Sequence, residues 1–127
     1  MLLRSNLGYI YRSDSEDYGR TWCNAYSTGL FNPNSGIDAV KMDDGTIMLL
    51  SNPIKNNWGY RAPLDLTYSK DNGKTWSLLK TLEETVEGKE EELEYSYPAI
   101  TSVGNKLYMT YTYNRLSIAY WEITIEE

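Results

Sequence analysis

The sequence predicts an all-β protein that is built from repeated units of antiparallel strands. Three observations support this prediction. An eight-residue pattern, S-x-D-x-G-x-T-W, occurs at 15–22 and again at 69–76, 54 residues later, and such a period is typical of architectures with one supersecondary unit per repeat. Short runs of β-branched and aromatic residues alternate with turn residues. No segment has the 3.6-residue hydrophobic period of an amphipathic helix, so we expect almost no helix.

Expected strands and turn-rich loops alternate along the whole chain. The loops include an Asn-, Pro-, Ser- and Gly-rich segment at 28–36, an Asp-Asp-Gly hairpin signal at 43–45 and a longer loop at 52–62. The Glu-rich segment 83–94 is expected to be a solvated loop. The expected strands, or parts of strands, lie at 1–3, 8–13, 22–26, 37–42, 46–51, 64–68, 77–82, 97–102, 106–113 and 117–125.

These strands group into units that predict a partial β-propeller. Residues 37–82 contain a complete unit, residues 1–26 the back half of a preceding one, and residues 97–125 three strands of a last one. We therefore expect a single fragment of about two and a half four-stranded antiparallel blades. A strand from the opposite terminus often completes the last blade of a closed propeller and so removes the exposed sheet edges. The chain could therefore also complete its ring by self-association.

The repeated octapeptide has the residues of a tight hairpin loop that bonds to itself. The short carboxylates of Asp17 and Asp71 can accept hydrogen bonds from the backbone N–H groups that follow them. Gly19 and Gly73 can adopt the positive φ that such a turn needs, and the tryptophan that ends each copy can pack back over the loop. The two aspartates could be catalytic acids or loop staples, and we expect them to be staples.

Composition restricts the function. The net charge is −6, and the seven Glu and one Lys of 83–94 account for all of it. No basic stripe is present, which argues against a nucleic-acid partner. The sequence has no histidine and one cysteine, Cys23, so histidine-based catalysis, histidine metal sites and an intrachain disulfide are excluded. We expect no cofactor and no metal.

Nothing in the sequence indicates a membrane segment. The longest fully apolar run, 47–50, is far too short to span a bilayer. No signal peptide is visible at the N-terminus, so the sequence leaves both a secreted and a cytoplasmic location open.

Four motifs resemble those of sialidase-like β-propellers. The octapeptide resembles their Asp-box, also called the BNR repeat, which in that family lies on the rim away from the active site. The segment 49–53, LLSNP, followed by Arg61, resembles the segment with the third arginine of a triad that binds the substrate carboxylate. The segment 3–6, with Arg4, resembles the segment with the second arginine. The segment 94–97 resembles the A-Y-S-S segment of the catalytic tyrosine, here Tyr95.

The resemblance implies the C-terminal part of a sialidase-like exo-glycoside hydrolase acting on a glycan or glycoside. Guanidinium groups bind carboxylates bidentately. Sialidases use a tyrosine nucleophile, which needs a neighbouring carboxylate as a base. The family's first arginine, its Asp acid/base and the Glu paired with the tyrosine would all lie upstream of residue 1, so the resemblance implies that this fragment is inactive alone.

Further residues are candidates for the same cleft. Asn34, Ser35 and Asp38 precede or open a strand whose start could face the substrate, and we expect them to bind it. Tyr97 lies two residues after Tyr95, on the same strand face by the period of two, and could replace it as the nucleophile. Arg115 follows an expected strand and could line the cleft.

A non-catalytic role is the alternative. The loop at 52–62 carries Trp58 and Tyr60, and exposed aromatic rings can stack on sugars. The chain could then be a carbohydrate-binding or scaffolding propeller segment. A hydrolase for another acidic or deoxy sugar on the same fold is a variant of the first hypothesis.

Overall fold

The computed structural model describes residues 1–126, and these form ten β-strands in three antiparallel sheets. The first sheet has the order β1 (Leu2–Leu3), β2 (Tyr9–Arg12), β3 (Tyr26–Phe31). The second has the order β4 (Asp38–Lys41), β5 (Ile47–Ser51), β6 (Leu64–Ser69), β7 (Ser77–Glu83). The third has the order β8 (Tyr95–Val103), β9 (Lys106–Tyr113), β10 (Ser117–Thr124).

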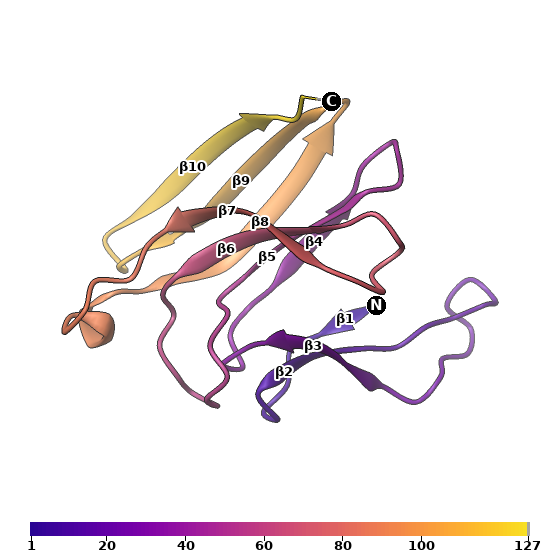
Figure 1. Ribbon diagram of the computed structural model, residues 1–127, viewed down its shortest axis with the longest axis horizontal. Coiled ribbons are helices and arrows are strands. Elements are labelled where there is room, and N and C mark those ends of the chain that lie inside the picture. The colour runs from indigo at the N-terminus through magenta and orange to yellow at the C-terminus, as the bar shows by residue number, and fades with distance from the viewer. Residues whose placement is uncertain (127) are drawn as a thin grey trace.

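The three sheets are successive blades of a partial β-propeller. They follow one another in sequence and stand side by side, from indigo through magenta to yellow in Figure 1. The first strands of neighbouring sheets, β4 and β8, contact each other. One hydrogen bond joins them directly, because the backbone N–H of Ile100 donates to Asp38 Oδ2 at 2.9 Å. The all-β prediction and the blade architecture are both confirmed.

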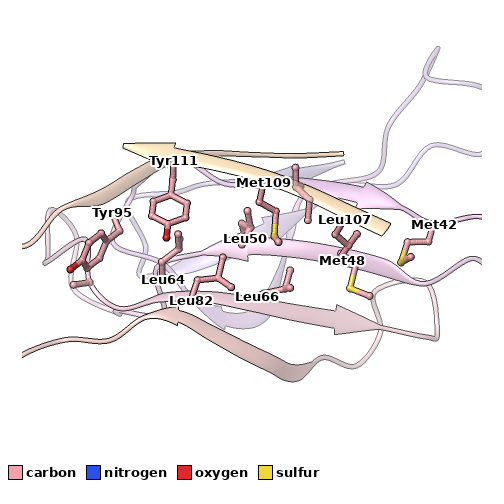
Figure 2. Packing of buried hydrophobic residues seen from close by; sticks show 12 residues of the cluster. Met42, Met48, Leu50, Leu64, Leu66, Leu82, Tyr95, Leu107, Met109 and Tyr111 are labelled. Atoms are coloured by element: carbon pink, nitrogen blue, oxygen red, sulfur yellow. The ribbon is translucent and has the colours of Figure 1, made fainter. Parts of the chain in front are cut away.

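An apolar cluster fills the space between the second and third sheets (Figure 2). The strand period of two turns Leu107, Met109 and Tyr111 of β9 toward it, and each is at most 1% exposed. Leu50 of β5 and Leu64 of β6 pack opposite them and are fully buried. Burying a side chain of this size stabilises the fold by roughly 1.5–3 kcal/mol, so this layer fixes how the two blades sit together.

Both Asp-boxes are closed by their own hydrogen bonds. In the first, Asp17 accepts from the backbone N–H and the hydroxyl of Thr21, at 2.8 and 2.6 Å. In the second, Asp71 accepts from the same two groups of Thr75, at 2.8 and 2.5 Å. Each tryptophan donates its indole N–H to the carbonyl of the box glycine, at 3.0 and 3.2 Å. The carboxylates therefore act as loop staples, as expected.

Some element boundaries differ from the prediction. The third strand begins at Tyr26 rather than at residue 22 and runs through Phe31, into the expected loop 28–36. Pairing with β2 explains this extension, since the Thr28 hydroxyl donates to the carbonyl of Ile10 at 2.6 Å. A turn of 3₁₀ helix at Glu90–Glu92 is the one helical element of residues 1–126. Within this part of the chain, no helix has the length and apolar character needed to cross a membrane.

Candidate functional site: the loop rim around Arg61

The loops that join the strands gather at two opposite ends of the sheets (Figure 1). One end carries both Asp-boxes and the hairpin turns at 43–45 and 104–105. The other end, which we call the loop rim, carries the segments 4–8, 32–37, 52–63, 84–94 and 114–116.

Backbone strain is concentrated at the loop rim. Seven non-glycine residues among those described have positive φ, and two of them, Tyr18 and Asn72, lie in the Asp-boxes. Residues in this region of backbone space cluster at functional sites, because the surrounding structure must hold them there. Four of the other five lie on the loop rim, and Tyr97 lies near the start of β8. The five are Asn34 (63°), Trp58 (57°), Tyr97 (53°), Asn114 (51°) and Arg115 (56°).

Arg61 lies at the junction between the second and third blades. Its backbone carbonyl accepts a hydrogen bond from the N–H of Tyr95 at 2.9 Å, where β8 begins. Its guanidinium carbon lies 5.6 Å from the centre of the Tyr97 ring, within cation–π range. Its Nη1 atom is 4.0 Å from Oε1 of Glu94, and its side chain is only 20% exposed. The ring and the carboxylate thus lie next to this guanidinium, and the backbone pairing fixes the position of the Arg61 backbone beside β8.

A second arginine closes the other side of Glu94. Arg115 donates from Nε to Oε2 at 2.8 Å and from Nη2 to Oε1 at 3.0 Å, which is the bidentate arrangement of a strong guanidinium–carboxylate pair. The hydrogen bond from Arg115 lowers the pKa of Glu94 below its ordinary value, so this carboxylate is charged at neutral pH. The Arg115 side chain is 79% exposed, whereas that of Glu94 is 18% exposed.

These side chains line an open recess of about 480 Å³. Tyr60 and Gly59 form its wall on the 52–63 loop, and the segment 90–94 forms the wall on the acidic loop. An arginine pair beside an aromatic ring in such a recess can bind an anionic group on a ring-shaped ligand. Within residues 1–126, no group of three or more His, Cys, Asp or Glu side chains has the arrangement of a metal site.

Tyr95 is part of the core rather than of this recess. It is 4% exposed, and its ring packs against Tyr111 and Tyr113 with centroids 6.3 and 5.4 Å apart. Figure 2 shows it at one end of the apolar cluster. Burial raises the pKa of the Tyr95 phenol above its ordinary value, and the nearby charge of Glu83 raises it further. A phenolate is therefore disfavoured at this position.

Tyr97 lies on the opposite face of β8. The ladder to β9 shifts register between Ser96 and Ala99, and Tyr97 has a φ of 53°. This bulge turns Tyr97 outward, so that it is 64% exposed whereas Tyr95 is buried. The expectation that the two tyrosines share a strand face is wrong, because a bulge breaks the period of two.

Comparisons with known proteins agree with this fold. A family model described as a BNR repeat-like domain matches residues 1–109. The chain belongs to this BNR repeat-like family. Its resemblance to sialidase-like propellers with Asp-box repeats is thereby confirmed. In a comparison with curated proteins, no sequence matches.

Solved structures of a polysaccharide lyase, an ulvan lyase, have a similar fold. The structure of this lyase bound to -[GlcA(1-4)Rha3S]- matches with a TM-score of 0.50 and 17% identity, over 87% of this chain and 30% of the lyase. Another structure of the lyase matches with a TM-score of 0.49, at the same identity and coverage. The chain thus spans about a third of the lyase's length, and the likeness concerns the fold.

Three of the expected substrate-binding residues of this BNR repeat-like chain lie near β4. Ser35 is fully buried and donates its hydroxyl to Oδ1 of Asn52 at 2.8 Å. Asp38 accepts the backbone N–H of Ile100, as described above. Both side chains are therefore engaged in holding the blades together. Asn34 is partly exposed on the loop rim, with positive φ.

Arg4 is not among the residues that line the recess beside Arg61. It follows β1 in the first blade and is exposed. The first and second blades do approach each other beside it, since a Cβ built on Gly8 would lie 2.7 Å from the carbonyl oxygen of Lys55. Arg4 and Arg61 thus share the loop rim and stand on neighbouring blades.

Sequence reasoning assigned no role to Asn52 or Glu94. Asn52 is fully buried, and its Nδ2 donates to the carbonyls of Pro63 at 2.9 Å and Tyr95 at 3.0 Å. The one signal for Asn52 was its place in the SNP segment. Glu94 is one of seven glutamates in the acidic segment 83–94, so composition did not single it out. Its position directly before β8 distinguishes it from the others.

Proposed function

We propose that this chain is part of a sialidase-like exo-glycoside hydrolase, and that its loop rim binds an acidic sugar. The observation that carries the proposal is Arg61, which lines an open recess and whose guanidinium lies 5.6 Å from the centre of the exposed Tyr97 ring. Membership of the BNR repeat-like family supports a carbohydrate-active propeller. The lyase that is bound to -[GlcA(1-4)Rha3S]- supports a glycan ligand for this fold.

In this proposal Arg61 binds the sugar carboxylate. A guanidinium stays charged at every working pH and presents two parallel N–H groups to a carboxylate. Arg4, exposed on the neighbouring blade, would be a second arginine for the same ligand, and Asn34 would offer an amide beside it. The enzymatic activity belongs to the whole protein.

Exposure favours Tyr97 over Tyr95 as the nucleophile. A nucleophile must reach the anomeric carbon of a bound sugar, and Tyr97 is exposed beside Arg61. Tyr95 is buried between two tyrosine rings, in surroundings that oppose its ionisation. We therefore assign the nucleophilic role to Tyr97 and a packing role to Tyr95.

Hydrolysis of a fluorogenic sialoside by the full-length protein tests this assignment. We expect Arg61→Ala to raise KM and Tyr97→Phe to abolish turnover. Tyr95→Phe is the matched control, since it removes the same atom two residues away, and it should keep turnover. Full activity of Tyr97→Phe would remove Tyr97 from the mechanism.

Trp58 favours a second candidate, a non-catalytic carbohydrate-binding segment. Trp58 is 73% exposed although its backbone is held at a φ of 57°, and its backbone N–H donates to the carbonyl of Pro33 at 3.0 Å. A ring that is displayed in this way can stack on a sugar. Glycan-array binding without turnover, lost in Trp58→Ala but kept in Tyr97→Phe, would select this function.

Self-association is also proposed. β1 and β10 are edge strands of their sheets, so each leaves backbone groups open on one side, and open edges favour pairing with a further strand. Light scattering coupled to a sizing column tests this idea. A monomer at every concentration measured would refute it.

A further inference from the structure

We infer that Glu94 is a specificity-determining residue of the recess. Its carboxylate occupies the place at Arg115 and Arg61 that a ligand carboxylate would take, so an acidic sugar must displace it. The inference rests on the proposed function, because it concerns the ligand that Arg61 would bind.

Glu94 is already bound as a ligand would be. Both of its oxygens are engaged by Arg115, at 2.8 and 3.0 Å. Arg61 approaches Oε1 to only 4.0 Å. Two guanidinium groups around one carboxylate form a complete anion site, and here the chain itself supplies the anion.

The surrounding backbone holds Glu94 and Arg115 in this arrangement. The N–H of Glu94 donates to Oδ1 of Asn114 at 2.8 Å, and the N–H of Asn114 donates to the carbonyl of Glu94 at 2.7 Å. Asn114 and Arg115 both have positive φ, and two consecutive residues of this kind turn the chain back toward Glu94. Residues other than glycine disfavour this conformation. The fold therefore holds Asn114 and Arg115 in a strained turn that brings Arg115 to Glu94.

The two arginines differ in how easily they can exchange partners. Arg115 is 79% exposed, so water can solvate its guanidinium when it leaves Glu94. Arg61 is 20% exposed and is held against Tyr97. A ligand carboxylate would therefore meet the half-buried Arg61 and compete with Glu94 for the exposed Arg115.

The negative charge of the recess also opposes the binding of an acidic sugar. Glu90, Glu91 and Glu92 line it together with Glu94, so negative charge surrounds the two arginines. Removing the charge of Glu94 frees Arg115 and removes the repulsion at the shortest range. Removing the charge of Glu91 lowers the repulsion but frees no arginine, because none of the described ion pairs involves Glu91.

Titration calorimetry with glucuronate and with N-acetylneuraminate tests the inference, and galactose serves as the neutral ligand. We expect Glu94→Gln to bind both acids about tenfold more tightly than the wild type. The matched control Glu91→Gln should stay within about twofold of the wild type. Binding of galactose should be the same in all three proteins.

Equal or weaker binding of the acids by Glu94→Gln would overturn the inference, because Glu94 would then only position Arg115. Thermal melting establishes that the variant is folded. If it is not, Glu94→Asp keeps the charge but shortens the reach to Arg115, and it should also bind the acids more tightly. The proposed function fails separately, if Arg61→Ala binds the acids as well as the wild type does. If neither the wild type nor Glu94→Gln binds them, both ideas are refuted.

Discussion

Replacing Asn52 by alanine removes a buried side chain that forms hydrogen bonds to three segments of the chain, at Ser35, Pro63 and Tyr95. The Asn52 side chain is fully buried. It donates to the carbonyls of Pro63 and Tyr95 and accepts from the hydroxyl of Ser35, with distances between 2.8 and 3.0 Å. A typical buried hydrogen bond contributes about 1 kcal/mol, and a buried partner left without one costs about 1–3 kcal/mol. Ser35 and the Tyr95 carbonyl lie where water cannot easily reach them.

We therefore expect Asn52→Ala to lower the free energy of unfolding by about 3–5 kcal/mol. Urea unfolding followed by tryptophan fluorescence measures this change. Asn57→Ala is the matched control, because Asn57 lies exposed on the same loop, and it should change stability by less than about 0.5 kcal/mol. A loss under about 1 kcal/mol for Asn52→Ala would mean that the three partners find other hydrogen bonds, and would refute the reasoning.

Three further predictions follow from local features. Hydrogen bonds from Thr21 lower the pKa of Asp17 from 3.8 to about 2, and those from the box threonine also lower the pKa of Asp71. The stability that these carboxylates contribute is therefore present above about pH 4 and is lost as the pH falls toward 2. Replacing both by asparagine should flatten the dependence of the melting temperature on pH in this window. Tyr111→Phe removes a hydroxyl that donates to Glu83 at 2.5 Å and accepts from the Trp121 indole at 2.8 Å, so urea unfolding should show a loss of about 1–3 kcal/mol. Trp58→Gly should melt no lower than the wild type, because glycine relieves the strain of positive φ at an exposed position.

Interactions between near neighbours made much of the fold predictable from the sequence. The hydrogen bonds of each Asp-box join residues at most four positions apart. The eight-residue sequence therefore contains nearly everything that determines the structure of the loop. The alternation of Leu107, Met109 and Tyr111 likewise follows from the strand period alone. Blades that repeat such units could therefore be recognised before any contact between them was known.

The site depended on contacts between distant segments and on one irregular strand. The bulge at Tyr97 places Tyr95 and Tyr97 on different faces. Pro98, which has no N–H for the ladder, is the one residue nearby that is typical of a bulge or an edge strand. Arg115 meets Glu94 from 21 residues away, across a turn of two left-handed residues. A sequence pattern can name the arginines and tyrosines, but their pairing is decided by how the third blade packs on the second.

The two ends of the blades differ in how their loops are held, and this difference supports the choice of rim. Each Asp-box has a glycine at positive φ, Gly19 or Gly73, directly after one strained residue, Tyr18 or Asn72, and is closed by its own hydrogen bonds. Trp58 and Arg115 on the loop rim, and Tyr97 near the start of β8, are also in that conformation, at roughly 1–2 kcal/mol each. The side chains of Tyr97 and Arg115 contact distant partners, Arg61 and Glu94. Trp58 is held differently, because its backbone N–H donates to the carbonyl of Pro33. Glycine would relieve the strain at all three positions, but it would lose the contacts that the Tyr97 and Arg115 side chains make with Arg61 and Glu94.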